Sequence, residues 1–357
     1  MKSFTHDALP GRVRFGVGSV ESVAEEIGAL ERHAVLLVAD ALAKAVADDV
    51  ADRLGPRVVG RLDETRQHVP EELAARAVTA ARNTQADCVL TIGGGSATGL
   101  GKAVAIETGI PVVAVPTTYA GSEMTPIYGI TGAHKRTGRD LRVLPKVVVY
   151  DPALTTGLPS EVTASSGLNA LAHCVAALSA PGANPITSLL AEEGIRALAR
   201  SLPGAVERPD DLEARSDVLY GAYLAGATLA VTDTGLQHKL SHVLGGSFGL
   251  VHADVHAVLL PHTSAYNAPA APHALARVAA ALGGDADPAQ AGGLLHDLAA
   301  AIGAPTSLET IGMPADGLDA AAARAADQVG DSNLRAVDAA ALRDLLQAAF
   351  EGRRPSG

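Results

Sequence analysis

The sequence predicts two domains, an α/β domain over residues 1–157 and an all-helical domain over residues 158–357. In the first half, short apolar runs alternate with helical patterns, which is typical of buried parallel strands joined by helices. After Pro159 no comparable Val/Ile run occurs, and Ala/Leu-rich helical periodicity continues to the C-terminus. A chain of 357 residues is also long enough for more than one core.

Five short apolar runs are the predicted strands of the first domain. They are RVRFG, HAVLLVAD, ADCVLTI, IPVVAVP and LPKVVVYD, which begin at residues 12, 33, 86, 110 and 144. Helical patterns begin near Ser19 and cover residues 41–55 and 70–84, with a polar segment between the last two. In the second domain the clearest helical patterns cover residues 163–178, 184–202, 211–231 and 339–352.

Composition and charge exclude several classes of function. The formal net charge of -11 argues against an extended nucleic-acid surface, and an anionic substrate would need a local positive pocket. The N-terminal residues lack the apolar core of a signal peptide, and no uncharged apolar run reaches the roughly 20 residues of a membrane span. We therefore expect a cytoplasmic protein without nucleic-acid or membrane partners. Cys88 and Cys174 lie in apolar segments and are predicted to be buried thiols.

A glycine-rich turn joins a predicted strand to a helix. Gly93, Gly94 and Gly95 follow DCVLTI directly, and Ser96 comes next. Glycine lets the backbone turn sharply and approach a ligand, and a helix N-terminus offers free N–H groups to a phosphate. The pattern is not the GxGxxG fingerprint, so an ordinary strand–helix turn would explain these glycines nearly as well.

Two further features at strand ends favour a dinucleotide. Thr117, Thr118 and Ser122 follow the next strand, in VPTTYAGSEMTP. Asp40 ends HAVLLVAD, where a carboxylate would accept hydrogen bonds from an adenosine ribose and repel a 2′-phosphate. A helix N-cap is the alternative role for Asp40. The three features together predict a dinucleotide site, with NADH favoured and NADPH possible.

Four of the 12 histidines lie within LQHKLSHVLGGSFGLVHADVH. His238 and His242 are one helical turn apart, and so are His252 and His256. The segment GLNALAHC repeats this spacing with an asparagine and a histidine. A single histidine of this kind is more often a structural residue bonded to a carbonyl, and His256 is as well explained by packing alone. As a group, they indicate a site for a metal, for proton chemistry or for anion binding.

Several motifs in this order resemble the iron-containing alcohol dehydrogenase superfamily. They are GGGS, PTTYAGSE, DPALT, GLNALAH and HKLSHVLGGSFGLVHADVHAVLLPH, and the resemblance spans about residues 10–265. It implies a dehydroquinate synthase-like fold, with a dinucleotide-binding α/β domain, a helical domain, an active site in the cleft between them, and a homodimer. Gly99 replaces an acidic residue usual in this superfamily, whereas Lys102 fits and is implied to bind the cofactor.

The resemblance also implies where a metal would be held. Metal-dependent members use an Asp and three His, and the corresponding positions here are Asn169, His173, His238 and His252. Three positions match, but the carboxylate is replaced by a neutral carboxamide, which binds a hard divalent cation more weakly. We therefore expect no metal and regard the four positions as vestigial ligands.

Within the superfamily, PTTYAGSEMTPIYGIT, TGRDLRVLPK and GLNALAHCV look like the maleylacetate reductases. These enzymes use NADH or NADPH to reduce the carbon–carbon double bond of 2-maleylacetate, giving 3-oxoadipate in the degradation of aromatic compounds. Hydride addition to an enone places charge on the ketone oxygen. Histidines can stabilise that enolate and protonate carbon. Because the substrate is a dicarboxylate, an Asn in place of the Asp also removes a repulsive charge.

Roles follow from this chemistry. His242 is the predicted general acid or substrate-orienting residue. Pocket-lining residues that bind carboxylate or ketone oxygens are predicted to be Asn169, His173, His238 and His252. Candidate positive partners are Lys102, Arg139 and Lys239. For Arg139 and Lys239, a solvated surface or a ribose contact is at least as good an explanation.

Three alternatives stay open. A metal-dependent alcohol or polyol dehydrogenase that tolerates Asn169 would lose activity to chelators. A carbocyclic-phosphate lyase resembling dehydroquinate synthase would need several phosphate-binding Lys or Arg residues, and residues 236–256 contain only Lys239. A non-catalytic nucleotide sensor would not need the concentrated histidines.

Overall fold

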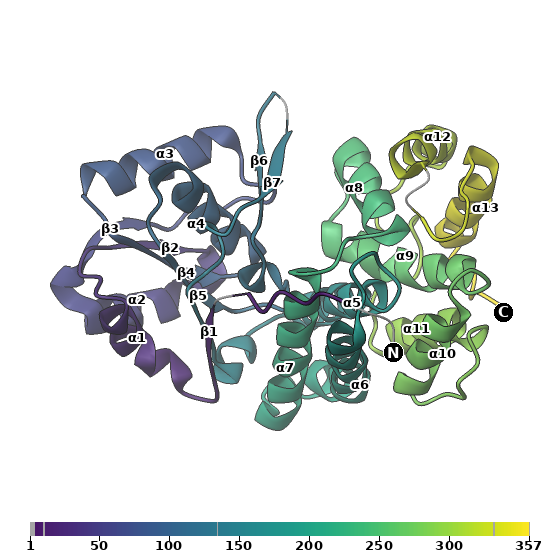
Figure 1. The fold of residues 1–357 in the computed structure, drawn as a ribbon, viewed down its shortest axis with the longest axis horizontal. Coiled ribbons are helices and arrows are strands. Elements are labelled where there is room, and N and C mark those ends of the chain that lie inside the picture. The colour runs from purple at the N-terminus through teal and green to yellow at the C-terminus, as the bar shows by residue number, and fades with distance from the viewer. Residues whose placement is uncertain (1–3, 10, 134, 331–332, 357) are drawn as a thin grey trace. The chain divides into compact units, whose positions relative to one another are not determined.

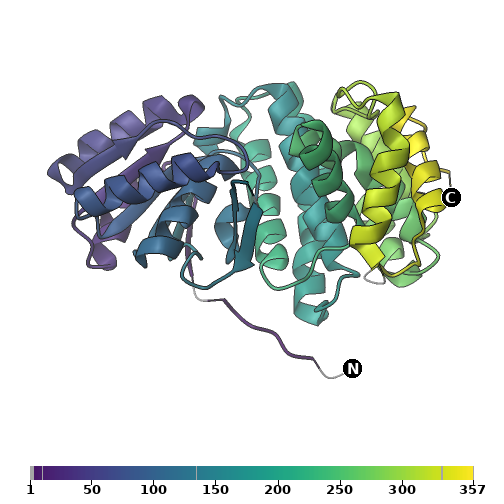
Figure 2. The same ribbon diagram turned by 90° about the horizontal axis from the view of Figure 1, so that it is seen from above.

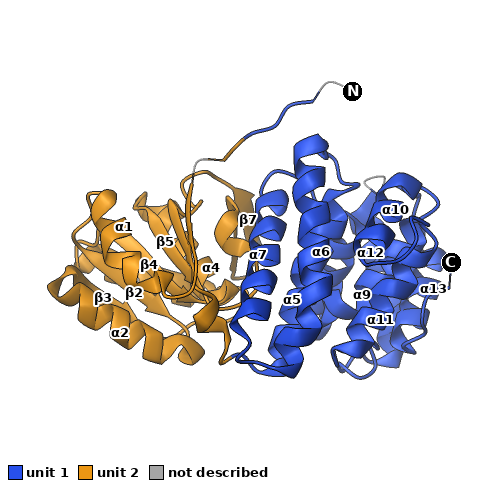
Figure 3. Cartoon of the chain, turned by 90° about the horizontal axis from the view of Figure 1, so that it is seen from below, with its two compact units in different colours: residues 1–7, 158–357 blue, residues 8–157 orange. Residues whose placement is uncertain are grey.

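A computed structural model describes the chain except for residues 1–3, 10, 134, 331–332 and 357. It divides into two compact units, Ala8–Gly157 and Leu158–Gly357, and Met1–Asp7 is grouped with the second (Figure 3). The first unit is α/β and the second is helical, which confirms the predicted fold class. Across the described residues, no helix has both the length and the apolar character to cross a membrane.

The α/β unit is built on a sheet that has six strands among the described residues, and all of its pairings are parallel. The strands, in spatial order, are β1 (Arg12–Phe15), β8 (Val147–Tyr150), β5 (Val112–Pro116), β4 (Cys88–Gly93), β2 (Val35–Ala39) and β3 (Val58–Leu62). The chain leaves β2 towards β3 and then continues with β4 on the other side of β2. The strand order therefore reverses between β2 and β4, and open α/β sheets bind ligands beyond the carboxyl ends of strands at such a point.

Three strands were missing from the sequence-based prediction. Val58–Leu62 was interpreted as part of a polar segment, but it forms the edge strand β3, which is only half-buried. Its sequence, VVGRL, has a short apolar run because an edge strand needs less apolar surface. The other two strands, β6 (Ile127–Thr131) and β7 (Lys135–Arg139), form an antiparallel hairpin.

Helices cover both faces of the sheet (Figure 1). The helices of this unit are α1 (Val23–Ala29), α2 (Lys44–Leu54), α3 (Glu71–Asn83) and α4 (Gly95–Thr108). One core combines α1 and α2 with Leu37, Leu90 and Val149 from the strands, and a second core combines α3 and α4 with Leu36 and Val89. Neighbouring strand residues thus face opposite layers, so the strands are apolar throughout.

The helical unit is organised around two groups of helices (Figures 1 and 2). Its helices are α5 (Ser160–Ala177), α6 (Pro185–Glu207), α7 (Leu212–Leu229), α8 (Leu236–Phe248), α9 (His252–Asn267), α10 (Pro272–Ala281), α11 (Gln290–Ala301), α12 (Leu318–Val329) and α13 (Ala339–Phe350). Helices α5, α6 and α7 pack on one another, and α9 contacts α5, α8, α11 and α13. The apolar core of α8, α9, α12 and α13 fixes how α8 and α9 present their polar residues.

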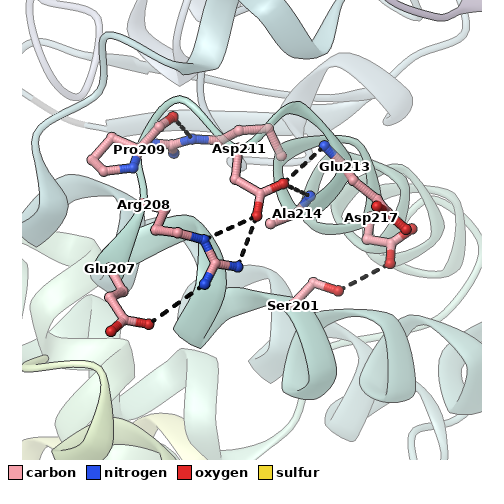
Figure 4. Close-up of polar contacts among 9 residues, drawn as sticks. Ser201, Glu207, Arg208, Pro209, Asp211, Glu213, Ala214 and Asp217 are labelled. Atoms are coloured by element: carbon pink, nitrogen blue, oxygen red, sulfur yellow. Dashed lines mark hydrogen bonds and ion pairs between the residues drawn. The ribbon is translucent and has the colours of Figure 1, made fainter.

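The turn from α6 to α7 is held by polar side chains (Figure 4). Asp211 caps α7, because its carboxylate accepts hydrogen bonds from the backbone N–H groups of Glu213 (3.2 Å) and Ala214 (3.1 Å). Arg208 donates to the same carboxylate at 2.8 Å. The buried Arg215 donates to the carbonyl of Pro209 at 2.8 Å. These contacts fix the start of α7, which packs against α5.

Both cysteines are buried, Cys88 in β4 and Cys174 in α5, and within the described chain both are free thiols. The prediction of two buried thiols is confirmed. Burial raises the pKa of Cys88 to about 12, with the charge of Asp87 acting in the same direction, so this thiol is unreactive at neutral pH.

Candidate functional site

The glycine turn lies beside the ends of the two neighbouring strands. β2, β4 and β5 are adjacent, so Asp40, the glycines and Thr117 come together at one edge of the sheet. The backbone N–H of Gly94 donates to Asp40 Oδ2 at 2.8 Å, and that of Thr117 donates to the carbonyl of Gly93 at 3.1 Å. The structure therefore brings together the three strand-end features that the sequence indicated.

The close packing of the turn requires glycine. Gly93 has a φ of 147°, and a Cβ there would collide with the Asp40 carboxylate. A Cβ on Gly94 would lie 3.0 Å from Thr118 Cγ2. Gly94 is the N-cap of α4, and within the described residues no side chain caps this helix. The first N–H groups of α4 are thus suited to a phosphate, and the adjacent Gly95 and Ser96 are half-buried.

Asp40 has a structural role in addition to any contact with a cofactor. Its Oδ1 accepts a hydrogen bond from Ala43 N at 2.9 Å and caps the short 3-10 helix Ala41–Ala43. Its Oδ2 accepts from Gly94 N, as described above. Each oxygen retains a second lone pair, so the carboxylate can still accept from a ribose. Both interpretations made from the sequence, the cap and the ribose acceptor, are compatible with this geometry.

Lys102 does not face the glycine turn as a cofactor ligand would. Its side chain is completely buried, and Nζ donates to the carbonyls of Ser122 (2.6 Å), Thr125 (2.8 Å) and Ile127 (2.8 Å) and to Thr125 Oγ1 (3.0 Å). Three N–H donors face four acceptor oxygens, so no donor is left for a phosphate. Burial lowers the pKa of Lys102 to about 7, and the charge of Glu123 acts in the opposite direction. In this structure Lys102 orders the loop that carries Ser122.

Gly99 and Ser122 also have clear surroundings. A Cβ on Gly99 would lie 2.8 Å from Val69 Cγ2, so a larger residue there would require Val69 to move. Ser122 is half-buried and contributes its carbonyl to Lys102, which leaves its hydroxyl as the group that could reach a cofactor. Of the predicted threonines, Thr118 is half-buried and Thr117 is buried.

Three helices of the second unit bring the histidines together. Asn169 and His173 come from α5, His238 and His242 from α8, and His252 from the start of α9. The ring centroids of His173 and His238 are 5.0 Å apart, and those of His242 and His252 are 5.4 Å apart. The three turn-spaced pairs in the sequence therefore form one cluster.

His256 belongs to the same cluster, although the sequence left its role open. Its ring centroid lies 4.5 Å from that of His252 and 4.7 Å from that of His238. It is completely buried, and Gln237 Nε2 donates to its carbonyl at 3.1 Å. Its four-residue spacing from His252 was the available signal, whereas nothing in the sequence pointed to Gln237.

The cluster extends from the interior of the helical unit to its surface. His173, His238 and His256 are buried, His252 is half-buried and His242 is exposed. Burial lowers the pKa of His173 to about 4. Burial, followed by the charges of neighbouring histidines, also puts the pKa of His238 and His256 well below the ordinary value. These three rings are neutral at pH 7, so they act as hydrogen-bond donors and acceptors and not as imidazolium ions.

Several polar atoms of the cluster are unpaired. Within the described part of the chain, the buried atoms without a hydrogen-bond partner include Asn169 Oδ1, His173 Nδ1, both ring nitrogens of His238 and His256 Nε2. Leaving a buried polar group unpaired costs about 1–3 kcal/mol. Such a concentration of unpaired groups indicates a ligand site, because a bound polar molecule would satisfy them.

The donor set lacks the carboxylate of the superfamily's metal site. Asn169, His173, His238 and His252 are a carboxamide and three imidazoles, so they bring no negative charge to balance a divalent cation. Asp254 on α9 is half-buried and hydrogen-bonded to Ser165, and burial raises its pKa. Among the residues that the structure describes, no three His, Cys, Asp or Glu side chains are placed to hold a metal ion.

The two remaining positive candidates are Lys239 and Arg139. Lys239 Nζ donates to the carbonyls of Gln328 (3.1 Å) and Val329 (3.4 Å), at the C-terminal end of α12. Its ammonium is thus engaged by helix carbonyls, and its role as a partner of the substrate stays a prediction. Arg139 ends β7 in the α/β unit and is exposed.

Comparisons with known proteins agree with this architecture. Residues 10–152 match the family model described as iron-containing alcohol dehydrogenase, and residues 163–350 match the C-terminal model of that family. The chain is similar to a maleylacetate reductase of Burkholderia cepacia, with 48% identity over 100% of both chains. A maleylacetate reductase of Sphingobium indicum is 48% identical over 99% of both chains. The crystal structure of maleylacetate reductase from Agrobacterium tumefaciens superposes with a TM-score of 0.94 at 47% identity, covering 99% of this chain and 100% of that one.

Proposed function

The chain belongs to the iron-containing alcohol dehydrogenase family, and from this premise we propose that it catalyses the NADH-dependent reduction of 2-maleylacetate to 3-oxoadipate. Relatives that align with the whole chain are maleylacetate reductases. The observation that carries the proposal is the uncharged, unpaired group of Asn169, His173 and His238, which offers hydrogen bonds without a carboxylate. This group suits a dianionic enone better than a metal.

NADH, when bound, supplies the hydride for the alkene carbon β to the ketone. The electron pair of the double bond then moves towards the ketone, and negative charge develops on the ketone oxygen. Neutral His173 and His238 are preorganised donors for that charge, because burial fixes both rings and excludes water. The Asn169 amide can donate to the same oxygen or to a carboxylate.

His242 is the proposed general acid. A proton must be added to the carbon next to the ketone, and the acid must recover that proton from solvent after each turnover. His242 is the exposed member of the cluster, and its ring stacks at 5.4 Å on that of His252. It can exchange protons with water, which the buried rings cannot do.

Two helix N-termini would contribute to binding the substrate carboxylates. α8 begins after Gly235 and α9 after Val251, and neither has a side-chain cap among the described residues. His238 lies in the first turn of α8, and His252 is the first residue of α9. The free N–H groups and the helix dipoles provide local positive potential in a chain whose net charge is -11.

The test is an assay with purified protein, NADH and freshly prepared maleylacetate in the presence of EDTA, followed by the absorbance of the reduced cofactor. We expect turnover that EDTA does not change. Absence of turnover with EDTA, together with recovery on adding iron or zinc, would establish the metal-dependent dehydrogenase instead. The matched variant Asn169→Asp restores the carboxylate, and it should bind a divalent metal more tightly while reducing maleylacetate more slowly.

We also propose a cofactor preference and an oligomeric state. Asp40 places a carboxylate at the switch point of the sheet, so we expect tighter binding of NADH than of NADPH. Fluorescence titration of both cofactors against wild type and Asp40→Asn tests this. The variant should show a smaller difference between the Kd for NADH and the Kd for NADPH. We further propose a homodimer, to be checked by light scattering.

A further inference from the structure

His256 is connected to two further buried polar side chains, which form a second layer. The rings of His256 and its neighbours His238 and His252 are nearly perpendicular, at 69° and 67°. The second layer consists of Gln237 of α8 and Thr263 of α9, which are 7% and 3% exposed. The established family membership gives no role to this layer.

The orientation of the Gln237 amide follows from its contacts. Its Nε2 lies 3.1 Å from the carbonyl oxygen of His256, which can only accept a hydrogen bond, so the NH₂ end of the amide must face it. The same nitrogen lies 3.3 Å from His256 Nδ1. Its second N–H therefore donates to Nδ1, which must be unprotonated.

Thr263 holds the amide in this orientation. Its Oγ1 lies 2.5 Å from Gln237 Oε1, and a hydroxyl can donate to this oxygen. Flipping the amide would place Oε1 against the carbonyl of His256 and remove both contacts. With Nδ1 accepting, the ring proton of neutral His256 is on Nε2.

Within the described residues, His256 Nε2 and both ring nitrogens of His238 have no hydrogen-bond partner, although the two ring centroids are 4.7 Å apart. A small rotation of either ring is therefore needed for His238 to accept from this Nε2–H. A neutral ring that accepts through one nitrogen carries its proton on the other. His238 would then present an N–H group to whatever binds in the pocket.

We propose that His256 is a positioning residue, held by Gln237 and Thr263 in the Nε2–H tautomer so that His238 donates a hydrogen bond to the substrate. The hydrogen bonds of this structure run in one direction, from Thr263 through Gln237 to His256. The link from His256 to His238 is part of the proposal. Such partners behind the groups that touch a ligand fix their tautomer and orientation. The last step, donation to the ketone oxygen, rests on the proposed function, whereas the tautomer of His256 does not.

The surroundings of this second layer favour a clean test. Gln237 and Thr263 line a cavity of about 50 Å³, together with Ser264 and Asn267. Isosteric changes at Gln237 and Thr263 keep the side-chain volume, so they alter the hydrogen bonds without repacking the apolar core.

The direct experiment is long-range ¹H–¹⁵N correlation NMR on protein labelled at histidine, with neither cofactor nor substrate present. The wild type should show His256 with its proton on Nε2, and His256→Gln assigns the signal by removing it. In Gln237→Glu the donor to Nδ1 is replaced by carboxyl oxygens, so Nδ1 should become protonated. A wild-type proton on Nδ1, or an unchanged His256 signal in Gln237→Glu, would overturn the proposal.

Kinetics supply the second readout. Gln237→Glu and Thr263→Val should each lower kcat by about ten- to a hundredfold, the range typical of such supporting partners, with a much smaller change in KM. Thr263→Ser keeps the hydroxyl and should restore kcat. Thr228→Val, which removes another buried hydroxyl of this unit that bonds a helix carbonyl at 2.9 Å, is the control and should act as wild type. Equal losses in Thr263→Ser and Thr263→Val would mean a merely structural role. If the wild type does not reduce maleylacetate at all, the proposed function fails while the NMR result still decides the tautomer.

Discussion

The glycine turn of the α/β unit and the histidine cluster of the helical unit prepare for ligands in opposite ways. At the turn, Asp40 already accepts from Ala43 and Gly94, and further along α4 the ammonium of Lys102 is occupied by oxygens of the loop that carries Ser122. What remains for a ligand is backbone N–H groups. In the cluster, buried side-chain atoms such as His173 Nδ1 have no partner in the described part of the chain. One site relies on backbone geometry, and the other on unpaired side chains.

This difference agrees with the chemistry proposed for each site. A pyrophosphate is the same in every cofactor molecule, so a rigid backbone cradle can bind it without reactive side chains. A reaction that develops charge needs polar groups whose hydrogen bonds become strongest in the transition state. Substitutions that separate binding from chemistry will therefore test the comparison.

The largest effect is expected from His242→Ala. Loss of the proposed acid should lower kcat by about 10²- to 10⁴-fold, the usual contribution of general acid catalysis. The Kd for NADH should stay within about twofold, because the cofactor is proposed to bind through the α/β unit. Stopped-flow turnover and fluorescence titration measure the two quantities. An unchanged kcat would remove His242 from the chemistry.

Lys102→Met should reduce stability more than cofactor affinity. Three carbonyls and one hydroxyl would lose their buried donor, and each unsatisfied group costs about 1–3 kcal/mol. Part of this cost is offset because the buried ammonium no longer has to be desolvated, so we expect a net loss of stability of roughly 3 kcal/mol. Urea unfolding measures this loss. The control is Lys44→Met, whose ammonium is exposed and paired with Asp48, and which should change stability by less than about 0.5 kcal/mol. A large loss of NADH affinity with normal stability would restore Lys102 as a cofactor ligand.

Acid should destabilise the protein through its buried histidines. Burial lowers the pKa of His262 on α9 to about 4 from 6.5, so above pH 6.5 both the folded and the unfolded forms are neutral. As pH falls below 6.5 the unfolded state binds a proton that the folded state does not, and by pH 5 this costs about 2 kcal/mol. Between pH 7.5 and 5, the unfolding free energy of His262→Asn should fall by about 2 kcal/mol less than that of the wild type. The control is His273→Asn at an exposed position, which should follow the wild type. Parallel curves for His262→Asn and wild type would contradict the expectation.

Gly93→Ala should have the smallest effect of the four and should act on the cofactor. The new Cβ would collide with the Asp40 carboxylate at a φ of 147°, and relieving that clash would move the turn. Strain of about 1–3 kcal/mol predicts a roughly tenfold weaker Kd for NADH, with kcat at saturating cofactor nearly unchanged. Gly28→Ala in α1, where a Cβ would have no described neighbour within 4 Å, is the control. Equal affinity in both variants would argue against the glycine turn as the phosphate site.

The sequence determined the parts of the fold that depend on local pattern. Buried parallel strands require uninterrupted apolar runs, so β2, β4, β5 and β8 could be predicted from the local sequence pattern alone. The half-buried β3 has no such run, and the hairpin of β6 and β7 was not anticipated. Helical spacing likewise identified His173, His238, His242 and His252 as a group. Their catalytic roles remain predictions.

Tertiary structure decided which side chains are available. Lys102 and Lys239 carry the positive charge that a phosphate or a carboxylate would need, but packing directs their ammonium groups to carbonyls. Gln237 and Thr263 have no signature in the sequence, because their importance comes from facing His256 across two helices. Residue type and spacing fix which face of an element is polar. Which groups meet across elements, and which stay unpaired, depends on packing between segments far apart in the chain.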